Sequence, residues 1–167
     1  MDAVEEFLSA DDLHPIDLVE TLAALNSWDF DRVADDQIAM VITGNWRNYA
    51  LSLVWSEYDE ILKLVCTFDL DPPKKQVSKL HEALDLANDR CWSGAFTLWP
   101  EEKSMVFRYG LNLSGGASAT GAQIDSMVGD CLDSCERFYP AFQLVCWGGE
   151  DPKTAMKIAF ERTYGCA

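Results

Sequence analysis

Histidine is scarce in this sequence: the 167 residues include only His14 and His81. Asp85 stands where a zinc-binding H-E-x-x-H helix starting at His81 would have its second histidine. A thiol nucleophile at Cys91 would need a histidine beside it, and His81 lies one helix face away. No glycine-rich segment continues into the G-K-[ST] of a phosphate loop. We therefore expect no enzymatic activity, no catalytic residues and no organic cofactor.

Long hydrophobic runs are also absent. No stretch of 18 apolar residues exists, so we expect no transmembrane helix. The first six residues, MDAVEE, are acidic, whereas a signal or transit peptide begins with basic residues. These two absences lead us to expect a cytoplasmic protein.

Basic residues are few, particularly near the start of the chain. The formal net charge is −15, and residues 1–36 hold eleven acids against a single base, Arg32. Binding to nucleic acid or to an anionic membrane requires clustered Lys and Arg, so we expect neither partner. The acidic excess leaves two interpretations: it keeps the chain soluble, or it attracts a basic partner.

Cysteine is the one metal-binding residue type present in number, with six copies. Without an export signal these thiols stay reduced, and their apolar neighbours suggest that they pack as small hydrophobic residues. Cys131 and Cys135 lie four apart on one helix face and could supply two metal ligands. No His or Cys pair elsewhere in the sequence completes such a site. We therefore expect core packing and no bound metal.

The hydrophobic periodicity predicts an α+β fold. Residues 1–12 are acidic and expected to be mobile, and residues 13–167 form a single domain. Strands are predicted at 29–33, 37–43, 47–55, 61–68, 95–99 and 105–113, and the short turns between them favour antiparallel pairing. Helices are predicted at 15–26, at 72–90 with Asp71 as N-cap, from Thr120 with a kink or end at Pro140, and at 151–164. Asn88 is expected to fix the connection from the second helix to the last hairpin.

The two faces of the predicted sheet differ in composition. One face is strongly apolar and must be core, whereas the other is small and semi-polar, too apolar to be wholly exposed to water. We expect a helix, a second subunit or another protein to cover part of it. The predicted partner-binding residues are Ala39, Val41, Val54, Lys63 and Val65. A homodimer would satisfy this surface.

A second hypothesis places a ligand pocket beside the last hairpin. Aromatic side chains with one fixed cation would suit a small anionic molecule. The residues proposed to line this pocket are Trp92, Trp99, Arg108 and Tyr109. In this alternative the protein is a small-molecule-sensing regulatory domain.

Several short segments, in this order, resemble the YbjN-domain family: CTFD at 66–69 with the prolines after it, LDLAN at 84–88, GAF at 94–96, VFRY at 106–109 and ERFYP at 136–140. The similarity covers roughly residues 15–150. Members are described as bacterial sensory transduction regulators without established enzymatic activity, so the resemblance implies a regulatory or binding role.

The family is similar in fold to type III secretion chaperones, which are small, acidic, often dimeric proteins that hold another polypeptide. The resemblance thus implies a strongly bent antiparallel sheet with about three helices. This chain adds a helix at 151–164 and the acidic first segment. We expect a non-enzymatic protein-binding module, chaperone-like or regulatory.

Overall fold

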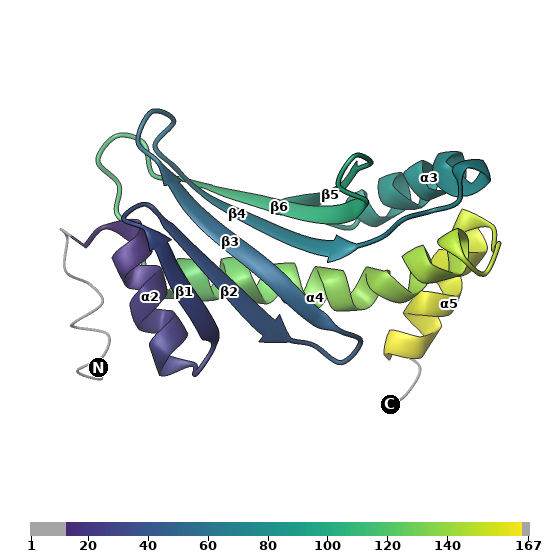
Figure 1. Cartoon of the computed structure of the whole chain (residues 1–167), viewed down its shortest axis with the longest axis horizontal. Helices are drawn as coiled ribbons and strands as arrows, with labels where there is room; N and C mark the ends of the chain where they lie inside the picture. The colour runs from purple at the N-terminus through teal and green to yellow at the C-terminus, as the bar shows by residue number, and fades with distance from the viewer. Residues whose placement is uncertain (1–12, 165–167) are drawn as a thin grey trace.

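The structure, a computed structural model, describes residues 13–164 and confirms the α+β fold (Figure 1). The predicted mobile segment at 1–12 and Cys166 lie outside the described residues. The six strands form one sheet in the order β1-β2-β3-β4-β6-β5, and every neighbouring pair is antiparallel. The strands are β1 (Asp29–Ala34), β2 (Gln37–Thr43), β3 (Asn48–Ser56), β4 (Ile61–Asp69), β5 (Gly94–Trp99) and β6 (Ser104–Asn112).

Residues 13–164 form four α-helices: α2 (Pro15–Leu25), α3 (Val77–Asn88), α4 (Gly121–Cys146) and α5 (Pro152–Tyr164). The long helix α4 runs along the sheet, with α2 near β1 at one end and α3 and α5 together at the other (Figure 1). The added C-terminal helix α5 therefore packs on α3 and α4. No helix in the described part of the chain combines the length and the apolar character needed to span a membrane.

The core lies between α4 and the inner face of the sheet, because alternate strand residues point toward the helices. Phe96 of β5 belongs to this core, and its ring centroid lies 5.0, 5.8 and 5.2 Å from those of Phe107, Phe138 and Phe142. These edge-on contacts join the last hairpin to α4 and add to the stabilisation from burial. The remaining inner-face residues include Ile38, Met40, Leu51, Leu53, Leu64, Cys66 and Phe68.

The prediction that α3 begins at Asp71 and Pro72 is wrong. A short 3-10 turn (Lys74–Gln76) precedes α3, and the residue before it, Pro73, is extended with φ −54° and ψ 144°. A proline disfavours helical geometry in the residue before it, so Pro73 holds Pro72 out of a helix. The Asp71 carboxylate instead lies 3.5 Å from Lys103 Nζ.

For Pro140 the sequence left two alternatives open, a kink or an end of the helix, and the second is wrong, because α4 continues to Cys146. Proline removes one backbone hydrogen bond from a helix interior. Here Pro140 and its neighbours Tyr139, Ala141 and Phe142 are buried, so packing of the last turns compensates for the lost bond. The predicted capping box at Thr120 is confirmed, with Thr120 Oγ1 accepting from the Gln123 amide at 3.1 Å.

Candidate functional site

The candidate site is the face of the sheet that points away from the helices, which we call the outer face. Strand register defines it, since directly paired residues share a face. Its members on β1 to β4 and β6 are Asp29, Asp31, Gln37, Ala39, Val41, Ala50, Ser52, Val54, Lys63, Val65, Thr67, Val106 and Arg108. The helices contact the sheet from its other side, through the core residues of the inner face.

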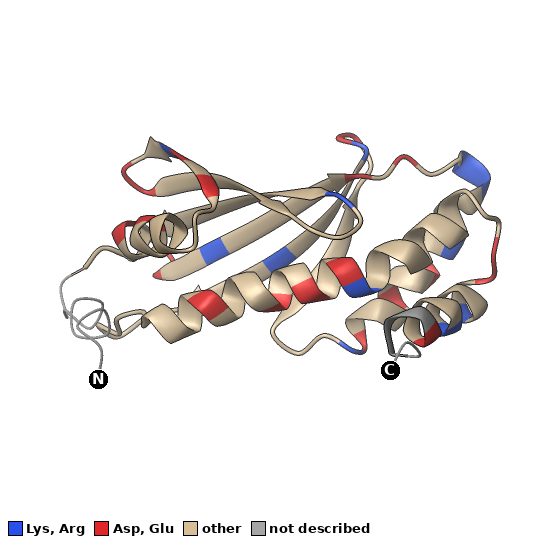
Figure 2. Ribbon diagram, turned by 90° about the horizontal axis from the view of Figure 1, so that it is seen from below, with Lys and Arg blue, Asp and Glu red and all other residues tan. Residues whose placement is uncertain are grey.

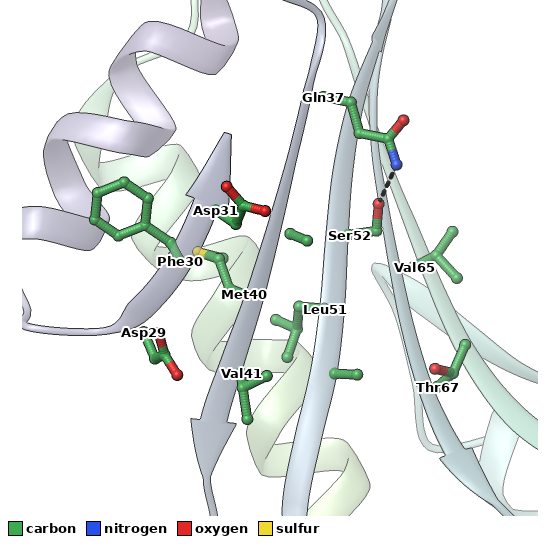
Figure 3. A pocket seen from close by; sticks show the side chains of 12 residues that line it. Asp29, Phe30, Asp31, Gln37, Met40, Val41, Leu51, Ser52, Val65 and Thr67 are labelled. Carbon is green, nitrogen blue, oxygen red and sulfur yellow. Dashed lines mark hydrogen bonds between the residues drawn. The ribbon is translucent and has the colours of Figure 1, made fainter. Parts of the chain in front are cut away.

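A groove of about 500 Å³ crosses this outer face from β1 to β4 (Figure 3). Small side chains on β2 and β3 form its floor, among them Ala39 and Ala50, while Val65 and Thr67 close it on β4. Val41 is 44% exposed within it, a large fraction for a valine in the second strand of a sheet. Gln37 Nε2 donates to Ser52 Oγ at 3.2 Å across the groove.

Charge is distributed unevenly around the groove. The carboxylates of Asp29 and Asp31 stand at its β1 edge (Figure 3). Lys63 and Arg108 lie on β4 and β6, beyond the opposite edge, and both are exposed. Lys63 Nζ contacts Asp59 Oδ2 at 2.6 Å, and this hydrogen bond holds the pKa of Asp59 below its ordinary value. The face therefore has a negative side at β1, an apolar middle and, on β6, the exposed guanidinium of Arg108.

All five residues predicted for partner binding lie on this one face. Ala39, Val41 and Val65 line the groove. Val54 and Lys63 are a cross-strand pair beside it. Sequence reasoning missed Asp29 and Asp31 as members of the site, although their spacing of two residues in a predicted strand was a signal that they share a face.

The alternative pocket does not assemble. Arg108 and Tyr109 are consecutive strand residues and point to opposite faces, so they cannot line one pocket. Trp92 is 99% exposed, and Trp99 lies at the far end of β5, paired with Ser104. Of the four proposed residues, only Trp92 borders the hollow of about 230 Å³ between α4 and the start of β5.

Asn88 has the structural role that its position suggested. Its side chain binds the backbone of Phe96 twice: Nδ2 donates to the carbonyl at 3.0 Å, and Oδ1 accepts from the amide at 2.6 Å. The predicted target was the connection at 90–94, and the actual target is the edge strand after it. Asn88 thus fixes the end of α3 against β5.

A third cysteine, from β4, joins the pair on α4, and the sequence did not indicate it. Cys66 meets Cys131 and Cys135 of α4 in the core, with the three sulfur atoms within 4.8 Å of one another. The Sγ atoms of Cys135 and Cys66 lie 4.0 Å apart. No further His, Cys, Asp or Glu among the described residues joins the cluster, which leaves it one ligand short of the four that structural zinc takes.

The chemistry of these thiols favours packing over metal binding. All three are fully buried, and a metal would require their deprotonation in an apolar core. The neighbouring thiols of Cys131 and Cys66, together with burial, raise the pKa of Cys135 well above its ordinary value. The three buried side chains fill the space between β4 and α4 as small hydrophobic residues.

Comparison with known proteins addresses the family and the fold. A sequence model of the YbjN family, described as "putative bacterial sensory transduction regulator", matches residues 15–144. No curated protein matches the sequence. The crystal structure of YbjN from E. coli, described as "a putative transcription regulator", superposes with a TM-score of 0.53 at 8% identity, over 88% of this chain and 93% of that one. The fold is therefore shared, and the family match extends over well more than half of the chain: the protein belongs to the YbjN family.

Proposed function

We propose that the protein is a non-enzymatic regulatory module that holds a protein partner on the outer face of its sheet. The observation that carries this proposal is the groove between β1 and β4, an apolar strip on a face that no described helix covers. Exposed apolar strips rimmed by charged residues are typical of interaction surfaces. The family description as a regulator supports a role in binding rather than catalysis.

A chaperone-like action, in which the face holds a segment of another chain, is compatible with the position of the added helix. Because α5 packs on α3 and α4 at one end of the molecule, it leaves the groove open. The thiols of Cys66, Cys131, Cys135 and Cys146 are free, which suits the reducing bacterial cytoplasm that we propose as the site of action.

Affinity capture from a lysate of the native cell tests this function. The bait is the tagged chain, compared with Val41→Asp/Val54→Asp, which places one carboxylate in the apolar strip and a second beside it on the same face. The control is Leu25→Asp/Trp92→Asp, which adds the same charge at two exposed apolar residues away from the outer face. Circular dichroism and the melting temperature establish that each bait is folded.

We expect the groove variant to lose the proteins, or the untagged copies of the chain, that wild type and control capture. Buried carboxylates without partners oppose association strongly. Equal capture by all three baits would show that the outer face is not the interaction surface. Loss of capture by the control alone would show that the interaction surface includes α2 or the 90–94 connection.

A further inference from the structure

One row of side chains crosses the outer face with opposite charges at its ends. Strand register places Asp31 beside Ala39, Ala39 beside Ser52, Ser52 beside Val65, and Val65 beside Arg108. Ser52 of β3 is the midpoint of this row. The carboxylate lies two strands to one side of it, and the guanidinium lies two strands to the other side.

Neither end of the row is neutralised by a residue that the structure describes. Asp31 and Arg108 are exposed, and neither takes part in an ion pair with any described residue. Four strand spacings separate them, about 19 Å, so they cannot reach each other. The charges are therefore available to a partner whose own charges have the reverse order along the row.

From this row we infer that the partner of the outer face is a second copy of the chain, packed sheet to sheet. The two-fold axis runs parallel to β3 above Ser52. This rotation exchanges the two sides of the face, so Asp31 of each copy lies opposite Arg108 of the other. A two-fold axis across the strands would instead place like charges together. The inference rests on the proposed function and names the partner of the same surface.

The neighbouring rows fit the same axis. Ala39 of one copy faces Val65 of the other, and Val41 faces Thr67, so the apolar strip becomes the dry centre of the interface. Gln37 faces Lys63, a polar pair at the margin. The row that begins at Asp29 ends at the buried Val106, so it carries no pair of opposite charges. The contact between Asp31 and Arg108 occurs twice in the dimer and supplies the electrostatic specificity.

The helical side of the molecule is a poor alternative surface for a second copy. The exposed residues of α4 include Asp125, Asp130 and Asp133, and acidic side chains recur along it (Figure 2). Two copies meeting there would oppose like charges. Acidic repulsion on that side and charge complementarity on the other both direct self-association to the sheet.

The size of the face is compatible with a specific but small interface. Five strands about 4.8 Å apart and about seven residues long cover roughly 500 Å² per copy, or about 1,000 Å² in total. This area is at the lower limit for a specific interface. The dimer is therefore reversible, with dissociation measurable in the micromolar range.

Charge reversal tests both the face and the axis. The variants are Asp31→Arg, Arg108→Asp and the double exchange Asp31→Arg/Arg108→Asp, and the measurement is sedimentation equilibrium from micromolar to about 100 µM. We expect each single variant to raise the dissociation constant about tenfold or more, since each creates two like-charge contacts, and the double exchange to restore it. An equimolar mixture of the two single variants should form a heterodimer, because all its contacts become complementary.

Heterodimer formation also proves that both single variants are folded. Two results overturn the inference: monomers for all samples at every concentration, or a dimer that the single variants and the mixture leave unchanged. If the chain is monomeric while capture from lysate still depends on Val41 and Val54, the outer face holds a different protein and the proposed function stands. If the charge-reversal variants behave as expected and capture from lysate finds only the chain itself, the results support both the proposed function and the dimer.

Discussion

The two hydrogen bonds from Asn88 to the Phe96 backbone allow a quantitative test of how the helices and the sheet are joined. Asn88→Ala removes both bonds, at 2.6 and 3.0 Å, and leaves one amide and one carbonyl of β5 without their partner. A neutral hydrogen bond contributes about 1 kcal/mol, and an unsatisfied buried group costs more. Water can reach edge strand β5, and alanine favours the end of α3 by about 0.5 kcal/mol. We expect a net loss of about 2 kcal/mol.

Urea unfolding followed by tryptophan fluorescence measures this loss as a lower transition midpoint with an unchanged m-value. For a chain of this size the melting temperature should fall by about 4–8 °C. Asn48→Ala is the control, since Asn48 is exposed and its side chain makes no hydrogen bond to the described residues; its change should stay within about 0.5 kcal/mol. If Asn88→Ala is as stable as this control, the bonds to Phe96 do not hold α3 to the sheet.

Asn88→Asp tests whether the donor of the Asn88 side chain is needed as well as its acceptor. The carboxylate keeps the acceptor for the Phe96 amide but loses the donor and faces the Phe96 carbonyl oxygen. That repulsion should raise the pKa of the new carboxyl group above its unfolded value. Relative to wild type, the variant should therefore be least stable at neutral pH and recover as pH falls through that pKa, because the protonated group donates again.

Two further residues have predictable effects. Glu136 of α4 accepts from the backbone amides of Asn45 and Trp46 at 3.0 and 3.4 Å, so Glu136→Ala should lower the free energy of unfolding by about 1 kcal/mol and Glu136→Gln by less; equal losses in urea titrations would argue against this contact. Burial raises the pKa of Cys146 to about 12, so with a thiol reagent at pH 8 this residue should react in urea but not in the native state. Rapid native labelling of Cys146, located by peptide mass mapping, would contradict its burial.

Much of the fold could be predicted because four of the five strand pairs are local hairpins, whereas the pairing of β4 with β6 is not local. Alternation along 37–43 and 61–69 identifies both faces, and short turns dictate antiparallel pairing. The misplaced start of α3 came from weighing Asp71 as a cap without the constraint that Pro73 imposes on Pro72. Periodicity could not decide whether α4 ends at Pro140 or continues past it, because the continuation depends on burial of the last turns by distant elements.

The site was predictable only in part, for a similar reason. The apolar members Ala39 and Val41 follow from alternation within one strand. The opposed charges of Asp31 and Arg108 belong together only through the register of five strands, which the sequence alone does not supply. The same holds for Cys66, which joins Cys131 and Cys135 only after β4 packs on α4.

Hydroxyl-radical labelling of the side chains, read by mass spectrometry, tests most directly whether the outer face is the interaction surface. The dilute chain is compared with the chain bound to the captured partner, or with a second copy at high concentration. The account predicts selective protection of Val41, Val54 and Val65, while the exposed Leu25 and Trp92 keep their labelling rates. Unchanged labelling of the three valines, with protection at Leu25 or Trp92 instead, would contradict it.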